Sequence, residues 1–112
     1  MDKLSLYRQL IQESLKQRAD LRSPDDPVRS QTIFDREDDH YQLVHVGWKN
    51  SNTRIYGCII HVDIIDGKIW IQHDGTEYGI ADQLVEKGVP KQDIVLAFRP
   101  AYIRQYTDFA VG

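Results

Sequence analysis

A hairpin signature lies in the sequence Arg54-Ile-Tyr-Gly-Cys-Ile-Ile-His-Val-Asp-Ile-Ile-Asp-Gly-Lys-Ile-Trp-Ile-Gln-His-Asp74. Two apolar, β-branched runs flank Asp66-Gly67, a dipeptide that tolerates the positive φ angles of a type I′ turn. The pattern predicts two antiparallel strands, 54–65 and 68–73, joined by a two-residue turn. We expect this hairpin to form the centre of an antiparallel sheet.

The segments beside this hairpin extend it to a meander of up to four strands. Residues 40–49 form the preceding strand, joined to the hairpin by a turn at 50–53. Residues 28–35 have the mixed polar and apolar character of an edge strand. The run 94–98 is apolar throughout, which indicates a further strand that is buried on both faces.

Two helices accompany the strands. Apolar residues at spacings of three and four predict a helix over residues 2–21, with Asp2 capping its first turn. A second helix is expected to begin at the capping-box pattern of Asp74 and Glu77 and to end at Gly88. The sequence therefore predicts a single α+β domain over residues 1–112. An antiparallel β-meander of about four strands plus a C-terminal strand packs against an N-terminal helix and one internal helix.

Composition narrows the functional classes. The net charge is −3, which argues against a free-standing DNA-binding module, because phosphate contacts need clustered Lys and Arg. Cys58 is the only cysteine, so neither an intrachain disulfide nor a cysteine-rich metal site is expected. The chain opens without an apolar signal segment and has no apolar run of the roughly 18 residues that a membrane span needs. We expect a cytoplasmic protein.

Strand alternation assigns the side chains to two faces of the sheet. A four-residue turn at 50–53 places Lys49 opposite Arg54 and His40 opposite Asp63, and the Asp66-Gly67 turn places His61 opposite Gln72. The expected core face carries Tyr41, Leu43, His45, Cys58, Ile60, Val62, Ile64, Ile69 and Ile71. The second face carries an apolar end with Val44, Val46, Trp48, Ile55 and Ile59, and a polar end with His40, Gln42, His61, Asp63, Trp70 and Gln72.

The polar end of the second face allows three interpretations. Two histidines and a carboxylate could hold a metal ion or form an acid–base pair. They could also belong to a surface for a partner or ligand. The favoured interpretation is a solvent-facing patch in which His40 and Asp63 pair across the strands. Since the sequence has no glycine-rich phosphate loop, no His-Glu-x-x-His and no zinc-ligand spacing, we expect no enzyme, cofactor or metal.

The apolar end of the second face is expected to be covered by other parts of the chain or by a partner. Apolar patches of this size usually lie under other structure or in an interface. The core face already requires the helices. We therefore expect a homodimer or a different protein partner docked near Trp48.

Residue matches over nearly the whole chain make it resemble the XisI family, the fdxN element excision controlling factors found mainly in cyanobacteria. The N-terminal half matches at Met1-Asp-Lys-Leu4, Tyr7, Gln31-Thr-Ile-Phe-Asp35, Asp39-His-Tyr-Gln-Leu-Val44 and Val46-Gly-Trp48. The hairpin region matches at Arg54-Ile-Tyr-Gly-Cys58, His61-Val-Asp63, Asp66-Gly-Lys-Ile-Trp-Ile-Gln72 and Asp74-Gly-Thr-Glu77. The C-terminal part matches at Gly79-Ile-Ala81, Leu84-Val85, Gly88-Val-Pro90, Asp93-Ile-Val-Leu-Ala-Phe98 and Tyr106-Thr-Asp-Phe-Ala110.

The resemblance implies an accessory role in site-specific excision of a DNA element during heterocyst differentiation. It implies a separate recombinase and a companion factor, XisH, that looks nuclease-like. The family has no established catalytic residues, so none is assigned here. The alternatives are a module that binds DNA directly and a small enzyme that uses His40, His61 and Asp63.

Overall fold

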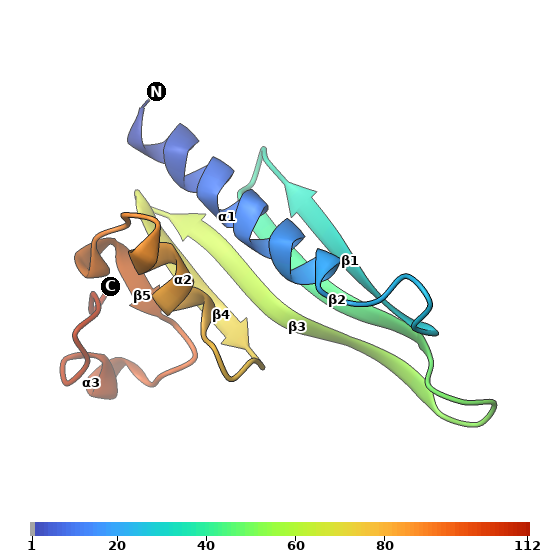
Figure 1. The fold of residues 1–112 in the computed structure, drawn as a ribbon. Helices are drawn as coiled ribbons and strands as arrows, with labels where there is room; N and C mark the ends of the chain where they lie inside the picture. The colour runs from blue at the N-terminus through green and yellow to red at the C-terminus, as the bar shows by residue number, and fades with distance from the viewer. Residues whose placement is uncertain (1) are drawn as a thin grey trace.

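The structure is a computed structural model that describes residues 2–112 (Figure 1). The elements follow the chain as α1 (Lys3–Asp20), β1 (Val28–Asp35), β2 (His40–Trp48), β3 (Arg54–Ile65), β4 (Lys68–Asp74), α2 (Ile80–Glu86), a 3-10 turn (Lys91–Asp93), β5 (Ile94–Leu96) and α3 (Ala101–Arg104). The strands form one sheet in the order β1-β2-β3-β4-β5. The α+β prediction is therefore confirmed.

Four strands form the predicted antiparallel meander, and β5 joins its edge in parallel with β4. Parallel neighbours need a crossover connection, which α2 supplies between β4 and β5. The turn at Asp66-Gly67 has φ values of 52° and 79°, as a type I′ turn requires. The sheet is therefore mixed, with the predicted hairpin at its centre.

Both longer helices, α1 and α2, lie on the same face of the sheet (Figure 1). We call this the helix face and the opposite side the open face. Asp2 caps α1 as predicted, because its carboxylate accepts the backbone N–H of Ser5 at 2.8 Å. The core between helices and sheet is made of buried residues that include Ile11, Leu15, Tyr41, Leu43, Ile60, Val62, Ile69, Ile71, Ile80, Leu84 and Ile94.

The start of α2 differs from the capping-box prediction. The helix begins at Ile80 after Gly79, with no capping-box bond between Asp74 and Glu77. Asp74 instead ends β4 and still serves the helix, since its Oδ2 accepts the Ile80 backbone N–H at 2.7 Å. The helix ends at Glu86, and Gly88 just beyond it has the expected left-handed φ, +102°.

Two β-bulges shift the predicted register. The β2–β3 ladder pairs His40 with Asp63 as expected, but it shifts between Leu43 and Val44, so that Trp48 rather than Lys49 lies opposite Arg54. The β3–β4 ladder shifts between His61 and Val62, which places His73 rather than Gln72 opposite His61. Each bulge adds one residue to one strand and therefore reverses the faces beyond it.

The C-terminal segment returns to the sheet edge. Ala110 forms a parallel bridge with Val95, and its backbone N–H donates to the Ile94 carbonyl at 2.9 Å. Lys68 Nζ donates to the Gly112 carbonyl at 2.5 Å. This part of the tail is packed as expected, whereas Tyr102 and Tyr106 are exposed. No helix within residues 2–112 is both long and apolar enough to cross a membrane.

Candidate functional site

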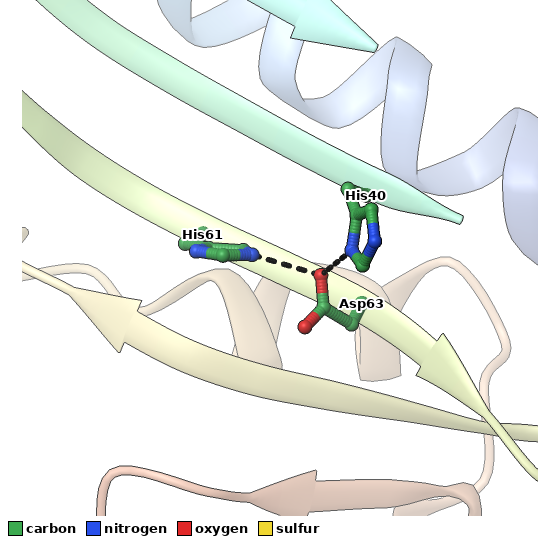
Figure 2. A group of neighbouring side chains, drawn as sticks. All are labelled: His40, His61 and Asp63. Carbon is green, nitrogen blue, oxygen red and sulfur yellow. Dashed lines mark hydrogen bonds and ion pairs between the residues drawn. The ribbon is translucent and has the colours of Figure 1, made fainter. Parts of the chain in front are cut away.

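Three side chains from two neighbouring strands converge on the open face: His40 of β2 with His61 and Asp63 of β3. We call them the His–Asp cluster (Figure 2). The ring N–H groups at His40 Nδ1 and His61 Nε2 both donate to Asp63 Oδ1, each at 2.8 Å. The two imidazoles stand nearly perpendicular, with ring centroids 6.4 Å apart. The cluster forms because His40 lies directly opposite Asp63, and His61 lies two residues away on the same face of β3.

Asp63 is the anchored member of the cluster. It is only 7% exposed, so its carboxylate depends on hydrogen bonds within the protein. Its second oxygen, Oδ2, accepts the side-chain amide of Gln72 at 3.2 Å. The hydrogen bond to the Asp63 carboxylate raises the pKa of His40, which favours the imidazolium form. The sequence prediction of a cross-strand His40–Asp63 pair therefore agrees with the structure, which adds His61 and Gln72 as further partners.

Trp70 lies opposite Asp63 and is partly covered by the C-terminal segment. The Arg104 guanidinium stands over its indole ring, 5.5 Å from the centroid, and a Cβ added at Gly112 would lie 3.9 Å from the ring. The indole N–H is buried and has no acceptor among residues 2–112. Trp70 therefore borders the His–Asp cluster as part of a covered region rather than as an exposed surface.

The apolar end of the open face has a different membership from the predicted one. Val44, Val46 and Trp48 lie there as expected, and Tyr56, opposite Val46, joins them. We call these four residues the Trp48 patch. Trp48 is 51% exposed and Tyr56 78% exposed, and the Arg54 guanidinium stacks on the Trp48 ring with 5.5 Å to the centroid.

Ile55 and Ile59 were wrongly placed on this face. Ile55 lies opposite Gly47 and lines a cleft under the loop that joins α1 to β1, and Ile59 packs against the core on the helix face. Cys58 was assigned to the core but lies opposite Val44 on the open face, where its Sγ accepts the Gln42 amide at 3.8 Å. The shifted turn and the bulge explain all three differences. Tyr56 was not predicted on the open face for the same reason, because simple alternation would place it on the opposite side.

A cleft of about 760 Å³ lies on the helix face between α1 and α2. Its floor includes Leu43, Ile59 and His45, and its rim includes Arg18 and Tyr78. Burial lowers the pKa of His45, so its neutral form is favoured. Arg18 is engaged by the protein itself, since it donates to Gln83, Thr76 and the Tyr78 carbonyl. No local sequence pattern predicts this cleft, because its lining comes from α1, the sheet and the α2 region, which are far apart in the chain.

Comparison with known proteins identifies a family and two solved structures that the chain resembles. The family model described as XisI protein matches residues 1–111. A crystal structure of a XisI-like protein from Anabaena variabilis is 45% identical, with a TM-score of 0.90 over 97% of this chain and 99% of that chain. The crystal structure of fdxN element excision controlling factor XisI from Anabaena variabilis is 38% identical, with a TM-score of 0.84 over 99% of this chain and 100% of that chain. A search of curated proteins finds no match. Extensive sequence identity and a shared fold thus lead to one conclusion: the chain belongs to the XisI family.

Proposed function

We propose that this protein is an accessory factor that controls site-specific excision of a DNA element of the fdxN type and acts by binding a protein partner rather than by catalysis. Family membership and the related structure named as an excision controlling factor support the excision role. The resemblance points to an XisH-like companion as the partner and to heterocyst differentiation as the setting. A reducing cytoplasm, suggested by the single cysteine, is part of the same proposal.

The observation that supports partner binding is the Trp48 patch. Helices α1 and α2 cover the helix face (Figure 1). The C-terminal segment approaches the open face at Trp70, at the end of the sheet away from Trp48. Trp48 and Tyr56 are left as exposed aromatic side chains on a rigid sheet, with Val44 and Val46 beside them. Large aromatic residues with a neighbouring Arg are the side chains that most often dominate binding energy in interfaces.

Electrostatics favours protein over DNA as the partner. The chain has 14 Lys and Arg residues against 17 Asp and Glu residues. Tight duplex binding depends on several phosphate contacts from basic side chains. An accessory factor that recruits or restrains a DNA-acting protein needs no such surface of its own.

The experiment is co-purification of the full chain with an XisH-like protein expressed in the same cells. Trp48→Glu places a charge in the proposed contact and should abolish recovery of the companion, because burying an unpaired carboxylate is strongly unfavourable. Tyr106→Glu is the matched control, since Tyr106 is a 79% exposed aromatic residue on the C-terminal segment. It should leave recovery unchanged. Excision measured in cells by amplification of the recombined junction should follow the same order.

Recovery of the companion by Trp48→Glu at the wild-type level would contradict the proposed contact. In a second form of the proposal, two copies of this chain pair through the Trp48 patch. The oligomeric state of the isolated protein distinguishes this homodimer from a contact with a different partner. Light scattering at high micromolar concentration then gives a dimer for the wild type and a monomer for Trp48→Glu. A wild-type monomer at that concentration removes the homodimer and leaves the hetero-partner.

A further inference from the structure

We propose that His40, His61 and Asp63 form a binding site for one divalent transition-metal ion of the kind that imidazole ligands favour, such as Zn²⁺. The site lies on the open face, at the opposite end from the Trp48 patch. It does not depend on the proposed partner contact, so the two can be tested separately. The proposal replaces the solvent-facing patch that the sequence favoured for these residues.

The positions of the donor atoms suit a metal. One nitrogen from each histidine and one Asp63 oxygen lie within 4.8 Å of one another. Zinc bonds of about 2.0–2.2 Å in a tetrahedral arrangement place neighbouring donors about 3.4 Å apart. Both N···O separations in the cluster are 2.8 Å, so an ion would replace the two N–H···O hydrogen bonds. Each ligating nitrogen would release its proton to solvent, and small rotations of the two imidazoles away from Asp63 would open the space for the ion. His40 has a 54% exposed side chain and His61 a 31% exposed one, which leaves them free to rotate.

The carboxylate that would anchor the ion is already held in place. Asp63 is buried, and its Oδ2 accepts the Gln72 amide, which leaves Oδ1 directed at both histidines. A hydrogen-bonded outer partner of this kind orients a ligating carboxylate in metal sites. All three ligands project from paired strands rather than from loops, so the backbone that holds them is rigid.

Satisfying the buried carboxylate does not by itself require both histidines. A buried carboxylate with one histidine and Gln72 would already have a partner on each oxygen. Instead, a second imidazole converges on the oxygen that is already occupied (Figure 2). A carboxylate oxygen can accept two N–H groups, and here that places both imidazole nitrogens beside Oδ1, with the three atoms within 4.8 Å of one another, where one ion could bind all of them.

The donor set indicates the class of ion that binds. Imidazole nitrogen suits zinc and other later first-row metals, while Mg²⁺ and Ca²⁺ prefer all-oxygen sites. Three protein ligands leave a fourth position to water, and the exposed side of His40 gives that position access to solvent. This ligand count is found in zinc sites that keep an open position, in contrast to closed structural sites with four protein ligands.

The test is titration of the metal-free full chain with Zn²⁺ in competition with a chromophoric indicator. We expect one ion per chain and no competition from Mg²⁺. His40→Ala and His61→Ala should each weaken binding by at least about 100-fold, more than Gln72→Leu, for which loss of an outer partner predicts about 10- to 100-fold. His73→Ala is the matched control, because His73 is exposed on β4 opposite His61 but lies outside the cluster. It should bind like the wild type.

Three results would overturn the proposal: no saturable binding by the wild type, unchanged affinity in both His40→Ala and His61→Ala, or equal weakening by His73→Ala. Thermal melting with and without Zn²⁺ gives a second readout and verifies that each variant folds. The ion should raise the melting temperature of the wild type and of His73→Ala but not of His40→Ala, since a ligand stabilises only the folded state that binds it. Trp48→Glu should bind Zn²⁺ normally, which separates a failure of this site from a failure of the partner contact.

Discussion

Arg8 of α1 forms a two-point ion pair with Asp39, the residue that precedes β2. Arg8 Nε lies 2.7 Å from Asp39 Oδ1, and a terminal guanidinium nitrogen lies 3.1 Å from Oδ2. The Tyr41 hydroxyl also donates to Oδ1 at 2.8 Å, and the Asp39 carbonyl accepts the Ile64 N–H at 3.1 Å. Asp39 has a φ of 59°, a left-handed conformation that Asp tolerates better than most residues. One residue of the turn between β1 and β2 thus joins the N-terminal helix to two strands.

Replacing Asp39 by Asn should destabilise the fold by about 2 kcal/mol, because the ion pair with Arg8 loses its charge while the left-handed backbone is kept. The Arg8 hydrogen bond lowers the pKa of Asp39 in the folded state. The ion pair therefore contributes its full stabilisation above the pKa of about 3.9 that the carboxyl group has in the unfolded chain. This stabilisation disappears as the pH falls through the lower pKa of Asp39 in the folded state. Urea denaturation at neutral and at strongly acidic pH measures this. The gap between wild type and Asp39→Asn should close in acid, and a constant gap would contradict the assignment.

Gly47→Ala should destabilise the protein by about 1–3 kcal/mol through overpacking. A methyl group at Gly47 would meet the Pro27 carbonyl oxygen and would lie 2.9 Å from Val28 Cα, both of them backbone atoms at the start of β1. Gly57→Ala on β3 is the control, because a methyl group there meets nothing within 4 Å. Thermal or urea unfolding should separate the two variants clearly. Equal stability would show that β1 shifts without cost.

His61→Ala should change the free energy of unfolding by less than about 1 kcal/mol when a chelator is present. His61 is partly exposed, and Asp63 retains His40 and Gln72 as hydrogen-bond partners after its removal. The measurement is urea denaturation in chelator, with Asp63→Ala for comparison. Asp63→Ala should cost more, since it leaves Gln72 and both histidines without their acceptor. A loss of several kcal/mol in His61→Ala would show that the hydrogen bond itself holds the sheet together.

The isolated protein should not bind duplex DNA tightly at physiological salt. Its net charge of −3 gives no overall attraction to the phosphate backbone, and that attraction supplies most of the affinity of DNA-binding proteins. A gel-shift titration with a duplex that contains the excision site is the direct measurement. Nanomolar binding at that salt would revive the interpretation as a DNA-binding module, and the same titration with the companion present tests whether DNA contact needs the partner.

The meander and the N-terminal helix could be predicted from the sequence because their signals are local. Asp66-Gly67 requires backbone angles that few other dipeptides accept, and Asp2 has its capping acceptor within one helical turn. The pairing of His40 with Asp63 was also predicted correctly, but only because two unforeseen register shifts cancel. The turn holds one residue more than expected, with Trp48 opposite Arg54, and the bulge in β3 restores the register before the His–Asp cluster.

The sequence by itself determined the strands, their central turn and the net charge of −3. The tertiary structure decided which face each side chain occupies between the turn and the bulge, and so it moved Ile55 and Ile59 away from Trp48 and brought Tyr56 and Cys58 to the open face. It also decided that two imidazoles and the Gln72 amide meet on one buried carboxylate. A bulge arises from the fit of a strand to its neighbours. Its position therefore depends on contacts between residues far apart in the chain, which a period of two along one strand cannot reveal.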